Sequence, residues 1–412
     1  MWKYGSRENS MRSSRAAPVI ISLIIALAVL SIDWDRGRAV AVLNAKEELR
    51  TAPTITKDVA KDYGGVSGDT INQAITDAKA FLGANPDATY LITIPAGTFT
   101  VAKTINVSNI GSRNGKGRLI VQGAGKDQTT LVSNPDQTGI QGRDTYHVSF
   151  IGIHFTLPNY TVSQGHVVSV APGQVVIDIQ KGFPSPNTIM ADRWVDCYEQ
   201  NHADAKSRCG PMRRYMRKYQ DSRTDPHMVE ENNKQLAWFL TSPEAGVDGR
   251  WKFTLSNQST TAPYAPGDLV GLKSKSLANT YFFCGGSDFE FKDIRWTHRS
   301  RGKFRCGFDH VTISGTEILR GPPVNGQVPA LSSPGGGPQI GHDGEATGHN
   351  LVENNRFVGT GDDSIGLFDN DGTTVVRNNQ IYDSFARGIL LKNSPSVQLE
   401  GNAVARSPVT YR

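Results

Sequence analysis

The C-terminal part of the chain repeats with a period close to 24 residues. Each repeat is a short apolar segment, an asparagine-containing turn and one further apolar residue. The closing apolar residues are Ile294, Ile318, Phe357, Ile381 and Val404, which gives steps of 24, 39, 24 and 23 residues. The step of 39 equals one period plus a 15-residue excursion, and the turn-forming residues from 321 to 338 supply that excursion. A fixed period of this size is typical of a solenoid, in which each repeat packs on its neighbour.

The turns of the repeat narrow the choice of solenoid. They carry asparagines, whose side-chain amides bond backbone groups and which tolerate left-handed backbone geometry: Asn354, Asn355, Asn378, Asn379 and Asn402. Strands of three to five residues between such turns fit a three-sided coil better than a sandwich, and the leucine pattern of a horseshoe repeat is missing. The pattern predicts an all-β fold, a right-handed parallel β-helix.

The first half of the chain predicts a cap and an insertion. From Asp69 to Phe81 the apolar residues recur at helical spacing, and this helix would cover the open end of the solenoid. Strand patterns at 90–101 and 119–125 follow it, whereas the rhythm is lost between about 170 and 276. We therefore expect four parts: a leader at 1–41, the cap and first coils at 42–169, an inserted small β-rich domain at 170–276, and coils with the candidate site at 277–412.

Residues 1–41 predict export. Four basic residues precede an apolar run from Ala16 to Ile32, and Ala39-Val40-Ala41 has the small residues of a cleavage site. Cleavage would give a secreted, periplasmic or cell-surface protein without stable membrane insertion; an uncleaved anchor is the alternative. Residues 1–41 carry six basic and three acidic side chains, so the formal net charge of +5 falls to +2 without them. This argues against nucleic acid as a partner, and the sequence leaves the oligomeric state open.

The four cysteines suit an exported chain. Cys197, Cys209, Cys284 and Cys306 allow two disulfides, whose connectivity the sequence leaves open. Their spacing does not match a zinc site. We expect a structural role.

Candidate chemistry lies in two segments that are one period apart. Residues 361–367 read Gly-Asp-Asp-Ser-Ile-Gly-Leu, and residues 385–391 read Phe-Ala-Arg-Gly-Ile-Leu-Leu. A 24-residue register places Arg387 on Asp363, about 4.8 Å away. A turn or bulge must precede Ser364 if both Asp362 and Asp363 are to leave the apolar side of the strand.

A third carboxylate was expected beside this pair. Asp343, with His342 before it, precedes the pair by nineteen to twenty residues, so that we expect it on the same wall. In a cluster of carboxylates, repulsion between like charges raises the pKa of one carboxyl group, while a nearby arginine lowers the pKa of another. At one pH the first can then act as an acid and the second as a base. An inverting glycosidase needs its two carboxyls about 6.5–9.5 Å apart. The cluster predicts glycosidic bond hydrolysis by Asp362, Asp363 and Asp343.

Basic and aromatic residues nearby are candidates for substrate binding. Arg299 falls at the register of Asp362 two coils earlier, and it could bind substrate together with Arg387 and His342; a solvated basic edge is the alternative. Trp296 is a candidate platform for a sugar ring or a rim residue. No cofactor is expected, although Asp369-Asn370-Asp371-Gly372 could form either an Asx turn or a calcium loop.

These motifs carry a family resemblance. The cap and first strands resemble the pectin-lyase-like β-helix superfamily. Asp343-Gly344, the Asn-containing strand and Gly361-Asp362-Asp363 resemble the β-helix α-1,3-galactosidases, and then the polygalacturonases. The resemblance implies metal-independent, inverting acid and base work by these aspartates on an oligo- or polysaccharide, a galactoside or a uronan. The chain departs from the pattern at His342 and Glu345 and lacks the Gly-His-Gly of polygalacturonases, with Arg387 where that histidine would fall.

Two other functions fit the same sequence. One is a non-catalytic β-helix that binds surface glycans. The other is a polysaccharide lyase that uses Arg387 or a lysine as base, with calcium on the acids. After Val404 no pattern of a cap follows, so we expect either another element to pack there or a shortened chain.

Overall fold

The structure is a computed structural model that describes residues 53–189, 214–230, 235–257, 259–274, 279–299, 301–342 and 344–411. All of these residues belong to one compact unit, Ala52–Arg412. The predicted leader and Cys197 and Cys209 lie outside the described residues. Among the helices that are described, none has the length and apolarity needed to cross a bilayer.

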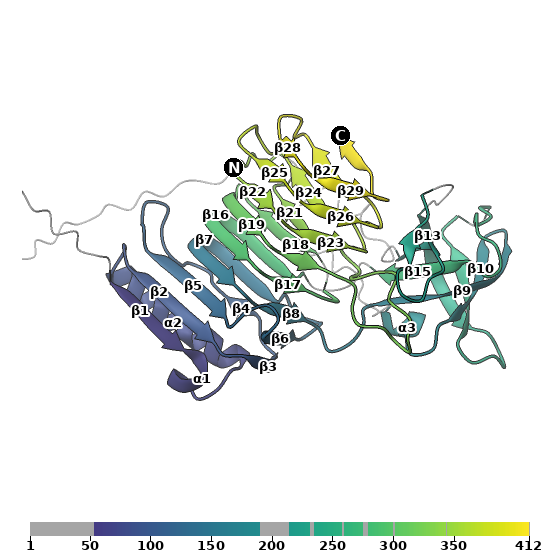
Figure 1. Cartoon of the computed structure of the whole chain (residues 1–412), viewed down its shortest axis with the longest axis horizontal. Coiled ribbons are helices and arrows are strands. Elements are labelled where there is room, and N and C mark those ends of the chain that lie inside the picture. The colour runs from purple at the N-terminus through teal and green to yellow at the C-terminus, as the bar shows by residue number, and fades with distance from the viewer. Residues whose placement is uncertain are drawn as a thin grey trace, which may run out of the picture. The chain divides into compact units, whose positions relative to one another are not determined.

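Most of the described strands pair in parallel and form three stacks that run along the molecule (Figure 1). Stack 1 contains β2 (Thr89–Ile94), β5 (Arg118–Gly123), β19 (Asp309–Ser314), β22 (Leu351–Glu353), β25 (Val375–Arg377) and β28 (Gln398–Glu400), with β1 (Thr54–Asp58) beside β2. Stack 2 contains β4 (Ile105–Asn106), β18 (Gly302–Arg305), β21 (Pro338–Ile340), β24 (Ile365–Phe368), β27 (Ile389–Lys392) and β30 (Val409–Tyr411). Stack 3 contains β3 (Gly97–Val101), β6 (Thr129–Ser133), β8 (His154–Thr156), β17 (Arg295–Trp296), β20 (Glu317–Ile318), β23 (Arg356–Val358), β26 (Gln380–Tyr382) and β29 (Ala403–Ala405).

Two long strands join stack 2 to stack 1. β7 (Ile140–Ile151) and β16 (Tyr281–Lys292) pair with each other in parallel over both stacks. The first part of β16 pairs with β18 in stack 2, and its later part pairs with β19 in stack 1. Each coil therefore passes from stack 2 to stack 1 and on to stack 3. This confirms the predicted parallel β-helix.

The register of the coils confirms most of the predicted period. Ile318 pairs with Phe357, Phe357 with Ile381, and Ile381 with Val404, which are the predicted steps of 39, 24 and 23 residues. The first step is wrong, because Ile318 pairs with Trp296 and not with Ile294. Both residues are buried, so the apolar pattern alone could not distinguish the residue in the strand from the residue just before it.

The asparagine turns form a buried ladder. Asn355 donates from its side-chain amide to Asn379 at 2.9 Å, and Asn379 donates to Asn402 at 2.9 Å. The preceding residues, Asn354 and Asn378, have φ angles of 55° and 53°. Each turn thus uses one asparagine for left-handed backbone geometry and the next for a bond to the neighbouring coil, as the sequence predicts.

The interior of the coils is one continuous apolar core. Aromatic rings fill its middle: Phe283 lies stacked on Phe304 with ring centroids 5.1 Å apart, and Phe155 on Trp296 at 4.5 Å. Trp296 is only 4% exposed. It is therefore a core residue, and the predicted sugar platform at this position is wrong.

The predicted helix is present as α2 (Gly68–Ala84), and the short α1 (Val59–Asp62) precedes it. Its N-cap is Ser67, and Ser67 and Thr70 form a capping box. Ile71, Ala74 and Ala78 are fully buried and belong to the same apolar core as the coils. The helix thus covers apolar residues at the first coils, as terminal caps do.

A second, antiparallel sheet is inserted between β8 and β16. Its strands are β9 (Val162–Ala171), β10 (Gln174–Ile179), β11 (Arg214–Gln220), β12 (His227–Met228), β13 (Leu236–Pro243), β14 (Arg250–Leu255) and β15 (Leu269–Ser274), and α3 (Pro186–Ile189) lies among them in the chain. β11 pairs with β15, which closes the sheet into a small barrel. The barrel begins at Val162, earlier than the predicted start near residue 170; the first four residues of β9, Val162 to Gly165, are buried.

The loops that join stack 3 to stack 2 are called the insertion corner below. They comprise residues 157–280 with the barrel, then 297–301, 319–337, 359–364, 383–388 and 406–408. The excursion predicted within 321–338 also falls here.

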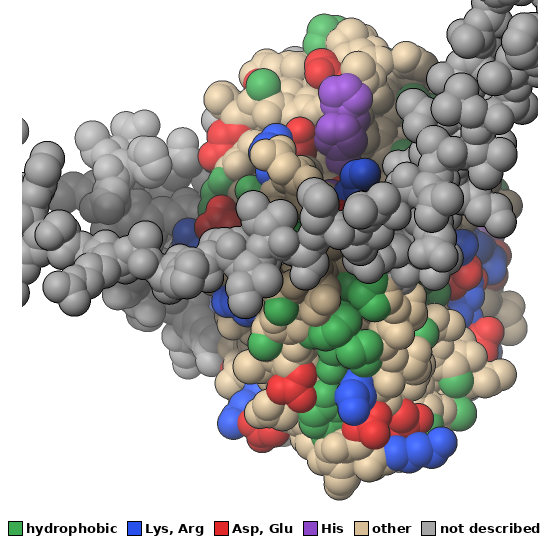
Figure 2. All heavy atoms as spheres, turned by 90° about the vertical axis from the view of Figure 1, so that its left-hand side faces the viewer, with side chains coloured by type: hydrophobic (Ala, Val, Ile, Leu, Met, Phe, Trp, Pro, Cys, Tyr) green, Lys and Arg blue, Asp and Glu red, His purple; other side chains and the backbone are tan. Residues whose placement is uncertain are grey.

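On the face shown in Figure 2, basic and acidic side chains occur in small interspersed groups rather than in a patch of one sign.

Candidate active site

The acid pair lies in the insertion corner, just before β24. Pairing of Gly302 with Pro338 and of Gln339 with Gly366 fixes the register of three successive coils. When the same offsets are applied to the loops, Asp362 lies above Gly335 of the preceding coil. Gly335 in turn lies above Arg299, one coil earlier. The barrel is inserted in the same corner, so its residues can reach the pair.

Asp363 is held by the arginine that the register predicts. Arg387 Nε donates to Asp363 Oδ1 at 2.5 Å, and Nη2 donates to Oδ2 at 3.0 Å. The Asp363 side chain is only 4% exposed. Burial and the neighbouring Asp362 raise the pKa of Asp363, and Arg387 and Lys273 oppose that increase. The bidentate pair fixes this carboxylate in one orientation.

Asp362 is the more accessible carboxylate of the two. Its side chain is 11% exposed, and Arg301 Nη1 lies 3.8 Å from its Oδ2. Arg301 belongs to a loop two coils below. Spacing along the sequence does not predict this contact, because it requires that the intervening coil carry no side chain at this point.

Glycines make that contact possible. In the intervening coil, Gly337 N donates to Asp363 O at 3.0 Å. A Cβ at Gly336 would lie 2.0 Å from Asp363 O, and a Cβ at Gly337 would lie 2.1 Å from Ser364 O. Gly335, Gly336 and Gly337, called the glycine window below, therefore let the backbones approach and leave a gap through which Arg301 faces the acid pair.

The bend before Ser364 is present as predicted. Ser364 is buried, and its hydroxyl lies 2.7 Å from that of Thr360 and 2.6 Å from that of Ser384 in the next coil. β24 begins only at Ile365, which pairs with Ile389. The chain thus turns between Asp363 and Ile365, so that Asp363 binds Arg387 while Ile365 enters the core.

The barrel contributes a lysine that sequence reasoning missed. Lys273, in β15, is fully buried; its amine donates to Gly361 O and lies 4.6 Å from the centroid of the Phe385 ring. It is one of the charges that lower the pKa of Asp363. The only sequence signal was a lysine in an otherwise apolar strand, Leu269–Ser274.

The third predicted acid, Asp343, lies outside the described residues, so its place beside the pair stays a prediction. Its neighbours His342 and Gly344 follow β21, in the loop from stack 2 to stack 1. Gly344 N donates to Asp369 Oδ2 at 2.9 Å, beyond the far end of β24. His342 is exposed there, away from the insertion corner, so the structure does not bring it to the acid pair. In this coil, Gly335 and Gly336 occupy the level below the acids.

Arg299 has the predicted register but not the predicted surroundings. It is 3% exposed, and Nη2 donates to Gln137 O at 3.2 Å and to Asn279 O at 3.4 Å. His298 beside it is 7% exposed. These two residues are therefore neither a solvated basic edge nor side chains facing a substrate groove; they lie within the protein.

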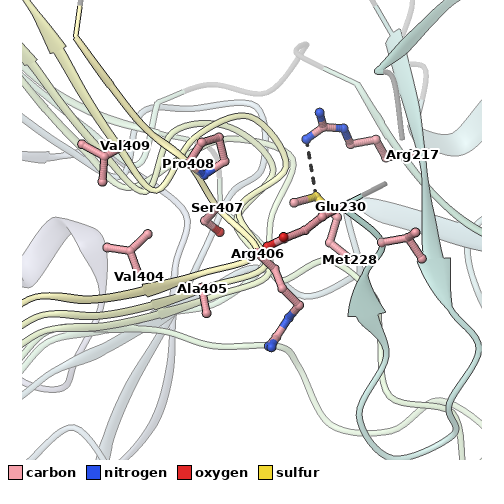
Figure 3. A pocket seen from close by; sticks show the side chains of 10 residues that line it. Arg217, Met228, Glu230, Val404, Ala405, Arg406, Ser407, Pro408 and Val409 are labelled. Carbon is pink, nitrogen blue, oxygen red and sulfur yellow. Dashed lines mark hydrogen bonds between the residues drawn. The ribbon is translucent and has the colours of Figure 1, made fainter. Parts of the chain in front are cut away.

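A cavity of about 780 Å³ lies between the barrel and the last described coil (Figure 3). Arg217, Met228 and Glu230 line it on the barrel side, facing the segment from Val404 to Val409. Gly388 N donates to Pro408 O, and Ser364 N donates to Arg387 O. The cavity wall is thus two coils from Asp363, roughly 10 Å at the usual strand spacing. Neither acid lines the cavity itself.

A buried ionic network fixes the barrel near this cavity. Asp383 is 1% exposed and accepts from Arg320 Nη2 at 2.9 Å, from Arg406 Nη2 at 3.1 Å and from the backbone N–H of Met228 at 3.0 Å. Burial alone would raise the pKa of Asp383, but the bonds from Arg406, Arg320 and Met228 hold it below its ordinary value. The network joins β12 to corner loops of three coils.

The described residues contain no group of three or more His, Cys, Asp or Glu side chains arranged to hold a metal ion. In the segment considered for calcium, Asp371 Oδ1 accepts from the backbone N–H of Thr373 at 3.0 Å. Asp369 Oδ1 accepts from the amide of Asn393 at 3.1 Å. Both carboxylates thus take part in loop hydrogen bonds.

Cys284 and Cys306 form a disulfide that joins adjacent coils of stack 2.

No protein-family model and no curated protein sequence matches the chain. Several solved structures are similar to it over 86% of its length. They include an alginate lyase from Paenibacillus sp. str. FPU-7 (TM-score 0.42, 11% identity, 76% of that chain covered). The catalytic domain of a GH87 alpha-1,3-glucanase in complex with nigerose has a TM-score of 0.37 at 13% identity. The DFA-IIIase from Arthrobacter chlorophenolicus A6 in complex with GF2 has a TM-score of 0.41 at 13% identity, with 71% of that chain covered. The present chain spans 46% of the glucanase domain. Similarity at this level assigns no activity.

Proposed function

We propose that the protein is an exported carbohydrate-active enzyme that hydrolyses a glycosidic bond, in a galactoside or a uronan, with inversion at the anomeric carbon. The observation that supports this proposal most directly is the buried pair Asp362–Asp363 with Arg387, Arg301 and Lys273 around it. Adjacent buried carboxylates retain a proton at a pH at which isolated carboxylates have lost it. Such a pair can protonate a leaving-group oxygen, the step that glycoside hydrolysis requires.

The geometry assigns different roles to the two acids. Both oxygens of Asp363 accept from Arg387, so Asp363 is fixed and acts on its neighbour as a charge. Asp362 is the more exposed, and we infer that it exchanges the proton with substrate. The cations around the pair also suit a substrate that carries hydroxyl or carboxylate groups. Hydrolysis by these groups needs no metal.

The test is the replacement of each acid in turn. We expect Asp362→Asn and Asp363→Asn to lower the rate on the substrate by roughly 10²–10⁴-fold, the usual contribution of general acid–base catalysis. The assay is a panel of galactosides and uronans, with the anomer of the product followed by NMR. Asp87→Asn, at an exposed turn, is the matched control. Unchanged rates in both variants would show that the pair is not the catalytic site.

The same panel separates the alternatives. A lyase would give an unsaturated uronate and lose activity with a chelator, whereas a glycan-binding protein would retain ligand without forming product. Arg387 is already committed to Asp363, which disfavours it as the base of a lyase. N-terminal sequencing of the protein from the medium or periplasm tests export: a mature chain that begins near residue 42 is expected.

A further inference from the structure

A second, much smaller cavity lies inside the coils, one level below the acid pair. Its volume is about 10 Å³, which is room for one water-sized occupant. Core side chains form most of its wall, among them Tyr281, Phe291, Trp296 and Ile318. Gly336 and Gly337 of the glycine window form another part of it. The polar residues Arg299, Thr316 and Thr280 line it as well.

Arg299 is a cation without an anionic partner. Its Nη2 donates to two backbone carbonyls, but Nε and Nη1 are buried and have no hydrogen-bond partner. No carboxylate of the described residues forms a salt bridge with it. Burial lowers the pKa of Arg299 to about 10, so the guanidinium remains charged at neutral pH. An unpaired buried charge is costly, and protein interiors normally compensate it.

Thr316 adds a second unsatisfied donor at the same cavity. It is 2% exposed, and its hydroxyl is buried without a partner, whereas its backbone N–H donates to Asn355. A hydroxyl group can turn its hydrogen toward whatever occupies the space. Arg299 and Thr316, which carry these unpartnered polar atoms, thus both line the cavity, and the rest of its wall is mostly apolar.

We propose that Arg299 and Thr316 form an internal binding site for a single halide ion, chloride under ordinary conditions. A water molecule would accept the same hydrogen bonds but would leave the charge of Arg299 uncompensated, whereas a monatomic anion does both. Polyatomic anions such as sulfate are too large for the cavity. The site is independent of the proposed catalytic function, since neither Asp362 nor Asp363 lines this cavity.

Thermal unfolding tests the proposal on the intact protein. At equal ionic strength, sodium chloride or bromide should raise the Tm above that in sodium gluconate by roughly 2 °C, because a ligand that binds only the folded state stabilises it. Arg299→Met should abolish this difference, and Thr316→Val should reduce it. Arg356→Met, at an exposed strand position, should retain it. An equal halide effect in wild type and both site variants overturns the proposal.

A direct measurement covers the case in which Arg299→Met does not fold. Crystals of the wild-type protein grown in sodium bromide should show one anomalous peak in this cavity, bounded by the guanidinium of Arg299 and the hydroxyl of Thr316. In Thr316→Val crystals the peak should weaken. Density for water without an anomalous peak overturns the proposal, because the cavity then holds a neutral occupant.

Discussion

Burial controls the titration of single residues near the insertion corner. Burial lowers the pKa of His298 to about 4, with a smaller contribution from His154, and burial and Arg295 lower that of His154 to about 4. Both imidazoles are therefore neutral in the folded protein at neutral pH. The unfolded chain binds protons at these positions from a pH of about 6.5 downward. Between about pH 6.5 and 4 the unfolded state thus binds more protons, and the folded protein loses stability as the pH falls.

His298→Gln should therefore flatten the dependence of stability on pH in this range. We expect the loss in the free energy of unfolding between pH 7 and pH 5, measured by urea titration, to be smaller in the variant than in wild type. Asp363 contributes with the opposite sign, since its raised pKa favours the folded state at low pH, but it is common to both proteins. His310→Gln, at an exposed position of β19, is the control. A slope identical to wild type would mean that His298 is protonated within the fold.

Site residues were predictable where the loops keep their length. Asp363 and Arg387 lie in loops of consecutive coils without insertions, so simple subtraction paired them correctly. His342 lies in a coil with a long excursion, and subtraction then placed it at the wrong corner. Lys273 comes from the barrel, and no local pattern relates β15 to the loop before β24. Arg301 depends on the absence of side chains in the glycine window, which no pairwise spacing reveals.

At the scale of elements, the repeat predicted the stacks because each turn combines two separate requirements. One asparagine adopts the left-handed conformation and the next bonds to the neighbouring coil, so the pair of asparagines marks the register twice. The prediction of the register fails at the first step, where Trp296 and not Ile294 pairs with Ile318. β17 has only two residues and lacks the asparagine turn before it, so that the apolar pattern alone fixed its position.

The glycine window makes a prediction for this element. Gly336→Ala should destabilise the protein by about 1–3 kcal/mol, because its Cβ would overlap Asp363 O and the two coils would have to separate. The same change should lower any activity that depends on Asp362. Gly83→Ala in α2, where no atom lies within 4 Å of the added carbon, should instead stabilise by about 0.5–1 kcal/mol. Urea unfolding midpoints measure both, and equal effects of the two substitutions would refute the steric argument.

At the scale of the whole molecule, the Asp383 network decides how the barrel is held on the coils. The predicted insertion follows from the loss of rhythm in the sequence. Its attachment does not, because Arg320, Arg406 and Met228 come from distant segments that only the folded chain brings to Asp383. Such contacts have no sequence period and cannot be found by counting residues.

Asp383→Asn should weaken this attachment. Removing one partner of a buried ionic network costs about 3–5 kcal/mol, and here the buried Arg320 loses the more buried of its two carboxylate partners. Hydrogen exchange should rise in β11 and β12 before it rises in stack 1. Asp178→Asn removes a carboxylate that pairs with Arg250 within the barrel, and because that pair is partly exposed it should cost about 0–1 kcal/mol. Unchanged exchange in β12 of the Asp383 variant would show that other contacts hold the barrel.

The glycine window also bears on how such a protein can diversify. Where one coil presents no side chains, a residue two coils earlier, Arg301, adds its charge to those of Arg387 and Lys273 around the acid pair. Under the proposed function, an exchange of Arg301 retunes the electrostatic preference for a neutral or an acidic sugar while the Gly-Asp-Asp motif stays intact. Homologues with identical motifs can then differ in substrate. The residue that determines the difference, at position 301, lies outside the Gly-Asp-Asp motif by which such homologues would be identified.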